Sequence, residues 1–305
     1  MSVRVAFSIP IHERLEVVKN QIENFKYFNP NCIIILHASL LLEIETKKIE
    51  ESLSEYDFVF INPVRILTGF ADSSQLYTHY INLKYLLDNN ISFDYFCLHA
   101  SNDMYVKAGF EQYVQSYSSL CFTNKYNRKE KKWLHAEIGY FDNRLKQIRN
   151  KIGQPDIYIS QVEGVCFSAE LAKKFESYIH PYFKEDKYSE KVKYFKKIGF
   201  KIWKHSYILQ PFLGKLYYCT EEIYPATILQ KISPQNGSPC VYLNWNKNLI
   251  VTQEDIQNIR DGKYKELGYT NSIDTMVFFA VKRINRDMED PIRKYITFNL
   301  MNTTK

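Results

Sequence analysis

Two adjacent glutamates at the start of a predicted helix are the residues best suited to proton chemistry. The segment Thr220-Glu-Glu-Ile-Tyr-Pro-Ala-Thr-Ile-Leu229 contains Pro225, and a helix accepts proline in its first turn, where the missing N–H is not needed. The helix is therefore predicted to begin near Glu221 or Glu222. Because a helix start carries the positive end of the dipole, we expect both carboxylates to be ionised. Such a carboxylate can act as a general base, and simple helix capping is the alternative interpretation.

A second polar group follows the predicted strand Tyr95–Leu98 and consists of His99, Ser101, Asn102 and Asp103. The aromatic and apolar run before it has no turn residue, which is typical of a strand buried on both faces. In open α/β sheets, ligands bind at the carboxyl ends of strands. This loop is therefore a candidate floor of a binding site, with an ordinary turn as the alternative.

Strands and helices alternate along the first half of the chain. Strands are predicted at Val3–Ile9, Cys32–Leu36, Phe58–Ile61 and Tyr95–Leu98, and helices at Glu13–Phe28, Glu45–Leu53 and Ser74–Leu87. Pro10 is expected to end the first strand. This alternation predicts a parallel sheet covered by helices. The first strand–helix junction has no glycine, which disfavours the usual dinucleotide-binding fold.

The second half is less regular. A strand is predicted at Val162–Phe167, followed by a helix with Ser168 as its N-cap. A further short helix is predicted at Thr252–Arg260, where Thr252 and Asp255 have the spacing of a capping box.

The composition favours a folded protein with a full core and a mild basic charge. The chain has 305 residues, 45% of them hydrophobic, and a formal charge of +6. Lysines cluster in Lys184–Lys204 and near Lys282–Lys294, which indicates either an anionic partner, such as a phosphorylated ligand or a membrane surface, or a solvated face. No nucleic-acid-binding motif accompanies the charge, so we expect no nucleic-acid partner.

The six cysteines are scattered, and no Cys-x-x-Cys motif occurs. This pattern argues against a zinc module and fits a reducing compartment. We find no signal peptide and no apolar run long enough to span a bilayer. We therefore expect a cytoplasmic protein, with contact at the inner face of the membrane through the Lys184–Lys204 segment as an option.

Several segments together resemble a known family. Glu221-Glu-Ile-Tyr-Pro-Ala-Thr227 is similar to an Asp-Glu-x-x-Trp-Ala-Thr element. Further similar segments are 6–12, 29–37, 93–107, 163–168, 242–245 and 279–282, in the same order as in the family. In this set the chain resembles the core-2/I-branching β-1,6-N-acetylglucosaminyltransferase family, which includes peptide O-xylosyltransferases. The match covers most of the chain, although Tyr105 replaces a proline of the family pattern.

The resemblance implies an inverting glycosyltransferase of GT-A type, with a Rossmann-like, mostly parallel sheet flanked by helices, a UDP-sugar as donor and no metal cofactor. The sequence bears on the metal independently. Metal-dependent GT-A enzymes hold the ion with an Asp-x-Asp pair, and no such pair occurs here. Fixed cations must then neutralise the leaving diphosphate, and Lys282 and Arg283 fit that need.

Carried over residue by residue, the resemblance makes Glu222 the catalytic base that takes the proton of an acceptor hydroxyl. The donor-binding residues are then Ile11, His12, Ser39, Asp103, Lys282 and Arg283, and the acceptor-binding residues are Glu137, Tyr242 and Trp245. Ser39 stands where the family has an acidic residue. We expect Asp103 chiefly to accept backbone N–H bonds that brace its loop.

The resemblance also implies one continuous domain in three parts. Residues 1–123 would bind the nucleotide sugar, residues 124–250 would bind the acceptor and hold the base, and residues 251–305 would close the donor site. The expected partners are a nucleotide-sugar donor, with UDP-GlcNAc the first candidate, and a glycan or lipid-linked acceptor in bacterial surface polysaccharide or glycoconjugate synthesis. Another donor, such as UDP-xylose or a hexose nucleotide, and a catalytically silent nucleotide- or sugar-binding protein remain as alternatives.

Overall fold

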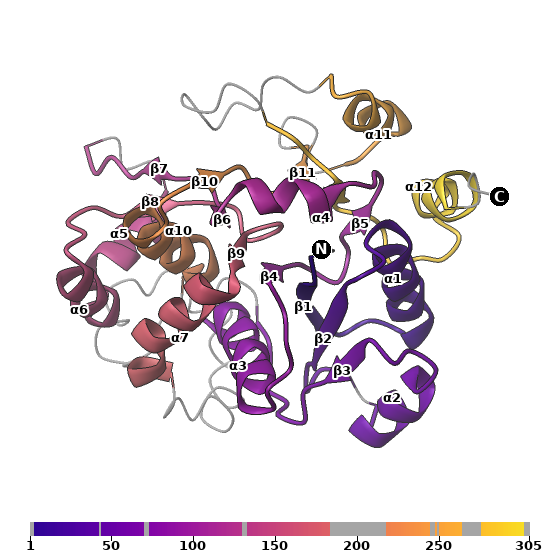
Figure 1. The fold of residues 1–305 in the computed structure, drawn as a ribbon, viewed down its shortest axis with the longest axis horizontal. Coiled ribbons are helices and arrows are strands. Elements are labelled where there is room, and N and C mark those ends of the chain that lie inside the picture. Colours follow the sequence, from indigo (N-terminus) through magenta and orange to yellow (C-terminus); the bar gives the residue numbers. More distant parts are fainter. Residues whose placement is uncertain are drawn as a thin grey trace.

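The fold is organised around a seven-stranded sheet with strand order β10-β6-β9-β4-β1-β2-β3 (Figure 1). This computed structural model describes residues 3–42, 44–69, 73–129, 133–183, 218–244, 248, 250–263 and 276–301. The strands are β1 (Val5–Ile11), β2 (Ile33–Ala38), β3 (Val59–Ile61), β4 (Tyr95–Leu98), β6 (Ser119–Leu120), β9 (Cys166–Ser168) and β10 (Asn236–Gly237). β1 runs parallel to β2 and β4, and β9 runs antiparallel to β4 and β6. The predicted α/β class with a mostly parallel sheet flanked by helices is therefore confirmed.

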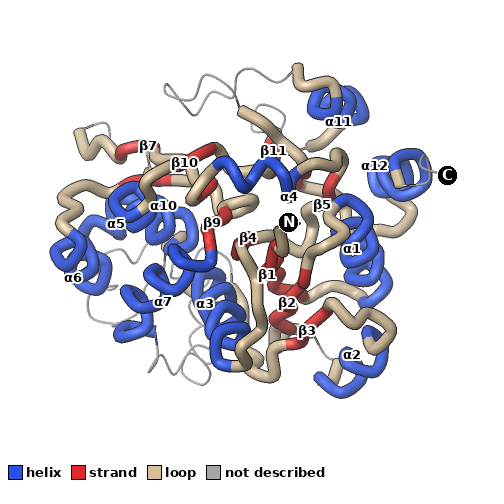
Figure 2. The backbone as a smooth tube through the Cα atoms, in the orientation of Figure 1, coloured by secondary structure: helices blue, strands red, loops and turns tan. Residues whose placement is uncertain are grey.

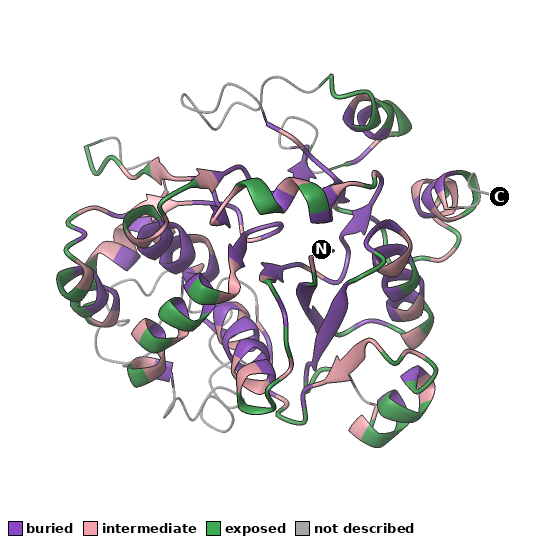
Figure 3. Ribbon diagram, in the orientation of Figure 1, coloured by how far each residue is buried: buried purple, intermediate pink, exposed green. Residues whose placement is uncertain are grey.

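Helices cover both faces of this sheet (Figure 2). One face carries α1 (Leu15–Phe28) and α2 (Thr46–Leu53), and the other carries α3 (Ser74–Asp88), α5 (Leu134–Phe141), α6 (Asn143–Ile152), α7 (Ala169–Phe183) and α10 (Thr220–Ile232). Successive strand residues point to opposite faces, so Phe7 and Ile34 join the α1 core while Ile33 and Ile35 join the α3 core. β1 and β2 are buried along their whole length as a result (Figure 3).

A smaller sheet packs over the α1 face. Its strands are β5 (Met104–Tyr105), β11 (Val241–Leu243) and β12 (Ala280–Lys282), in the order β11-β12-β5. Tyr105, Val241 and Val281 share one core with Phe7 of the large sheet. The two sheets are therefore held together by a continuous apolar layer. The remaining elements are α4 (Phe110–Tyr113), a 3₁₀ turn (Val114–Ser116), β7 (Asn124–Lys125), β8 (Tyr158–Ile159), α11 (Gln253–Arg260), α12 (Pro291–Lys294) and a π-helical turn (Tyr295–Leu300).

The strands and helices predicted in the first half are confirmed, with ends within two residues of those observed. The prediction that Pro10 ends the first strand is wrong, because β1 continues to Ile11. β4 pairs with β1 only as far as Ser8. The missing N–H of Pro10 therefore removes no ladder hydrogen bond on that side, which is where a sheet tolerates proline.

In the second half the predicted strand is shorter than expected, since β9 begins only at Cys166. The backbone N–H of Leu171 donates to Ser168 Oγ at 3.4 Å, as an N-cap would require. The predicted capping box of Thr252 and Asp255 is confirmed at the start of α11.

None of the helices within the described ranges has the length and apolar character needed to cross a membrane. The segment Lys184–Lys204, for which membrane contact is predicted, lies outside the described residues.

Candidate active site

Three titratable side chains from distant segments form one electrostatic group, which we call the charge group: Glu163, Glu222 and Lys282. Glu163 lies in the loop before β9, Glu222 in the first turn of α10, and Lys282 at the end of β12. Lys282 Nζ forms an ion pair with Glu163 Oε1, and the two side chains are only 14% and 7% exposed. Solvent therefore screens this pair little.

The Glu222 carboxyl interacts with both members of this ion pair. Burial, and then the negative charge of Glu163, raise the pKa of Glu222 to about 8, while Lys282 opposes the shift. The expectation that the helix start keeps this carboxyl ionised is therefore wrong. Loss of solvation and a nearby like charge outweigh the helix dipole. The dipole stabilises a carboxylate at an ordinary site by about 1 kcal/mol or less. A carboxyl with a pKa near neutrality is well matched to general acid–base work.

Lys282 remains a cation in this setting. Burial alone would lower its pKa, but the carboxylates of Glu163 and then Asp103 outweigh burial, so the pKa of Lys282 lies above its ordinary value. The group thus combines one fixed positive charge with a carboxyl that titrates near pH 8.

The turn at Gly164 positions Glu163. Gly164 has φ +78°, and a Cβ there would lie 2.6 Å from the backbone N of Val241. Only glycine therefore allows this turn to approach β11 so closely. Gln161 ties the same parts together, because its Nε2 donates to the carbonyls of Glu163 at 2.7 Å and Val241 at 2.8 Å. Glu163 has no role among the residues predicted from the sequence, although a Glu-Gly pair before a strand indicates a constrained turn.

A pocket of about 580 Å³ opens at the segment that follows Lys282 in the chain. Its described lining consists of Asn102, Asn248, Ile250, Val251, Arg283, Ile284, Asn285, Arg286, Asp290 and Ile292. The backbone N–H of Ile284 donates to the carbonyl of Asn102 at 3.0 Å, which joins the ends of β12 and β4 at this point. The pocket therefore offers two guanidinium groups, from the segment directly after Lys282, and the side-chain amides of Asn102, Asn248 and Asn285.

His12 is linked to this pocket by Glu13, which contacts both His12 and the lining residue Arg286. The Nε2 atom of His12 is 3.2 Å from Glu13 Oε1, and the same carboxylate oxygen accepts a hydrogen bond from Arg286. Burial lowers the pKa of His12, an effect that Glu13 opposes and Arg286 supports. The structure thus brings predicted donor-site residues His12, Lys282 and Arg283 to one region.

The structure does not bring Ile11 and Ser39 to the pocket surface. Ile11 is fully buried at the end of β1. Ser39 is also buried, and its hydroxyl accepts from Thr68 Oγ1 at 2.8 Å. Both side chains are enclosed by other contacts in this structure, and their contact with a donor stays a prediction. The carbonyl of Ser39 is one of four that Arg65 binds, together with those of Ala38, Leu42 and Ile44.

Asp103 is fully buried and accepts hydrogen bonds from the backbone N–H of Ala100 at 2.9 Å and from the ring of His99, whose Nδ1 is 3.0 Å away. These bonds are the loop-bracing role expected for it. Direct contact with a donor is a separate expectation, and it stays a prediction for this enclosed side chain.

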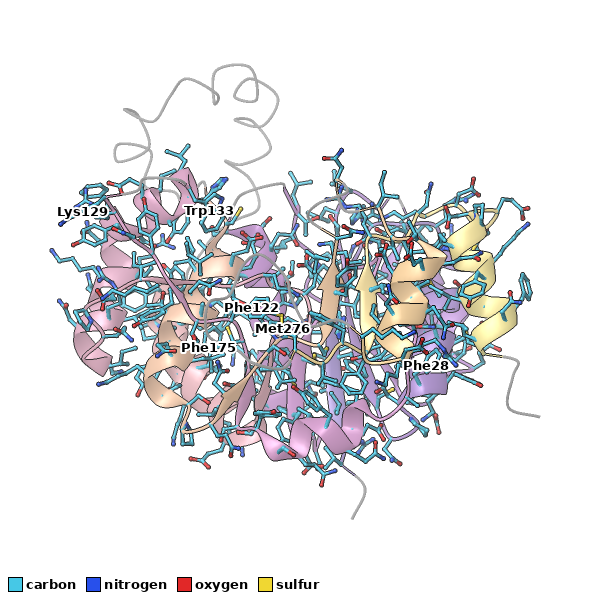
Figure 4. All side chains as sticks on the ribbon, turned by 90° about the horizontal axis from the view of Figure 1, so that it is seen from above. Phe28, Phe122, Lys129, Trp133, Phe175 and Met276 are labelled. Carbon is cyan, nitrogen blue, oxygen red and sulfur yellow. The ribbon has the colours of Figure 1, made fainter. Side chains whose placement is uncertain are left out.

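The predicted acceptor residues have three different outcomes. Glu137, on α5, forms an ion pair with Arg128 at 2.7 Å and accepts from Tyr126 Oη at 3.1 Å. The label of Trp133, which precedes α5, marks this region in Figure 4, on the opposite side of the molecule from Phe28 of α1. Tyr242 is 4% exposed and packs edge-to-face on Phe278, so it is not the open aromatic platform expected for a sugar. Trp245 lies outside the described residues.

No family model matches this chain, and no curated protein matches it either.

Proposed function

We propose that this protein is an inverting glycosyltransferase of GT-A type that transfers a sugar, GlcNAc from UDP-GlcNAc in the first place, to a hydroxyl of an acceptor glycan without a catalytic metal. The observation that carries the proposal is the electrostatic coupling of Glu222 to Glu163 and Lys282. The resemblance of several segments to the branching N-acetylglucosaminyltransferases supplies the reaction class, and the charge group supplies a base and a cation that such a reaction needs.

In the proposed reaction, Glu222 takes the proton of the acceptor hydroxyl as its oxygen attacks the anomeric carbon. The bond from that carbon to the diphosphate breaks on the opposite face, which inverts the configuration. A carboxyl with a pKa of about 8 is half ionised near that pH and binds the transferred proton readily. General-base catalysis of this kind contributes about 10²–10⁴-fold to a rate.

Lys282 and Arg283 would meet the negative charge that grows on the leaving diphosphate. The charge of Lys282 acts on the Glu222 carboxyl, and Arg283, the next residue, lines the pocket. A donor with its nucleoside in the pocket would therefore place its diphosphate between the two cations. Because Lys282 is paired with Glu163, the diphosphate would compete with a carboxylate already in place.

The decisive experiment measures sugar release and transfer from a panel of UDP-sugars, with and without a chelator. We expect turnover that survives the chelator, and Glu222→Gln should lower it by about 10²–10⁴-fold while calorimetry shows donor binding retained. Glu254→Gln is the matched control, since Glu254 is an exposed first-turn glutamate of α11. Near-normal turnover of Glu222→Gln would contradict the assignment.

The same assay tests the silent-binding alternative. The ion pair of Lys282 with Glu163 favours that alternative, because it already satisfies the cation without a ligand. Donor binding without turnover on any tested sugar would establish it in place of transfer.

A further inference from the structure

The space between the large and the small sheet contains a cluster of sulfur and imidazole side chains. Cys97 comes from β4, His99 follows β4, and Cys240 directly precedes β11. All three are fully or almost fully buried, and their ligand atoms lie within 4.8 Å of one another. We call these three residues the sulfur–imidazole cluster. None of them contributes to the charge group.

The atoms of the cluster, together with the hydroxyl of Tyr105, lie at distances that can be compared with those between the ligands of one ion. His99 Nε2 lies 3.4 Å from Cys97 Sγ and 3.3 Å from Tyr105 Oη, and Tyr105 Oη lies 3.7 Å from Cys240 Sγ. Zinc at about 2.3 Å from sulfur and about 2.1 Å from nitrogen or oxygen requires ligand–ligand distances of about 3.3–3.8 Å. Three of the six distances among these four atoms therefore fall in the range that zinc ligands need.

The ring of His99 is oriented as in a metal ligand. Its Nδ1 is 3.0 Å from Asp103 Oδ2, which leaves Nε2 directed at the sulfur atoms. A carboxylate on the remote ring nitrogen fixes the tautomer of metal-bound histidines in proteins. Phe7 and Phe25 pack edge-on against the ring at 5.3 and 4.9 Å between centroids, so apolar rings hold the imidazole in place.

We propose that Cys97, His99 and Cys240 form a structural Zn²⁺ site, with the hydroxyl of Tyr105 at the fourth corner. Binding would release two thiol protons to solvent, and the two thiolates would neutralise the charge of the ion in this apolar layer. Thiolate and imidazole ligands select zinc over hard cations such as Mg²⁺. A hydrogen-bonded thiol–imidazole cluster without metal is the competing account of the same distances.

The ion would join the two sheets. Cys97 belongs to the large sheet, whereas Cys240 and Tyr105 adjoin or belong to the strands of the small sheet that ends in Lys282. Because the ligands come from distant parts of the chain, the site forms only when both sheets are in place. The absence of a Cys-x-x-Cys motif therefore excludes a finger-like module but not this arrangement. The inference is independent of the proposed transfer reaction, in which no metal takes part.

The test uses the full chain, purified in reductant without chelator, incubated with excess Zn²⁺ and desalted. Elemental analysis should find about one tightly held zinc per chain. Exchange with Co²⁺ should give the intense visible bands of a tetrahedral ion and the near-ultraviolet charge-transfer band of cobalt bound to thiolate. Substoichiometric zinc after reconstitution, cobalt spectra without the thiolate band, or a Cys97–Cys240 disulfide in the reduced preparation would each overturn the proposal.

The variants localise the ion. Cys97→Ser with Cys240→Ser should lose the zinc and lower the Tm, whereas Cys121→Ser should keep it. Cys121 is equally buried, but its thiol donates to the carbonyl of Phe122 outside the cluster. Retention of zinc in the double variant would overturn the assignment. If that variant fails to fold, the thiolate-to-cobalt band of the wild-type protein decides the question alone.

Discussion

The charge group and the sulfur–imidazole cluster both lie where the large and the small sheet meet, but their side chains differ in kind. Glu163 and Lys282 keep a small exposed fraction and pair as full charges. Cys97 and Cys240 have no exposed surface and gather soft, weakly polar atoms. The segment Cys240–Val241 belongs to both regions, because Val241 borders the Gly164 turn. The comparison indicates that solvent access, more than position in the fold, decides whether charged groups or weakly polar atoms gather between two sheets.

The largest effect should come from a change that separates both regions at once. Gly164→Ala places a Cβ 2.6 Å from Val241 N at a residue with φ +78°, so strain and overpacking together should cost about 4 kcal/mol of the free energy of unfolding. Urea denaturation measures the loss. Gly262→Ala is the control: its φ is +68° but no atom lies within 4 Å, so about 1 kcal/mol is expected. Equal losses in the two variants would show that the close approach to β11 is unimportant.

Removing the cation should affect the charge group but leave the cluster intact. Lys282→Met leaves the Glu163 carboxylate enclosed without its partner, and breaking such a pair costs about 3 kcal/mol. Adding Glu163→Gln should restore most of this stability in a double-mutant cycle, since no unpaired charge then remains. Additive losses would show that the ion pair contributes nothing specific.

The titration of Glu222 gives a smaller, pH-dependent effect. Its pKa rises from 4.5 to about 8 on folding, so the folded state binds more protons than the unfolded state between these values. The contribution of Glu222 to stability is therefore fully present below pH 4.5 and is lost as the pH rises through about 8. Glu222→Gln should flatten this decline in Tm measured from pH 5 to pH 9.

If the charge group also catalyses transfer, wild-type turnover should rise over the same interval, as Glu222 ionises.

The smallest effect on stability is expected at the pocket. Arg283 is exposed, so Arg283→Ala should change the free energy of unfolding by about 0.5 kcal/mol or less. The loss of a diphosphate contact should nevertheless weaken UDP-sugar binding about tenfold, a change of about 1.4 kcal/mol measurable by calorimetry. Lys294→Ala, whose ion pair with Glu289 is on the surface, should leave donor affinity unchanged.

The sheet and most of its helices could be predicted from the sequence because their signals are local. Hydrophobic periodicity in Leu15–Phe28 and the apolar run of Tyr95–Leu98 record burial directly in residue spacing. The helix start predicted near Glu221 or Glu222 lies within two residues of the observed one. α10 begins at Thr220, and Pro225 lies in its second turn rather than its first.

The site was less predictable because its properties depend on contacts between remote segments. The raised pKa of Glu222 follows from burial and then from the charge of Glu163, whose position depends on the positive φ of Gly164. Tyr242 looked like a sugar platform in the sequence, but pairing of β11 with β12 buries it. The sulfur–imidazole cluster was invisible for the same reason, since β4 and the start of β11 meet only in the folded chain.

Arg65 has a kinetic consequence. Its guanidinium donates to the carbonyls of Ala38, Ser39, Leu42 and Ile44. One side chain therefore supplies the hydrogen-bond donors that a neighbouring strand would provide in a sheet. The stretch after β2 should therefore open in a single step when that guanidinium departs, and not fray residue by residue. The amide hydrogens of Leu40 and Leu42, which are bonded within this region, should then exchange with deuterium at one common rate.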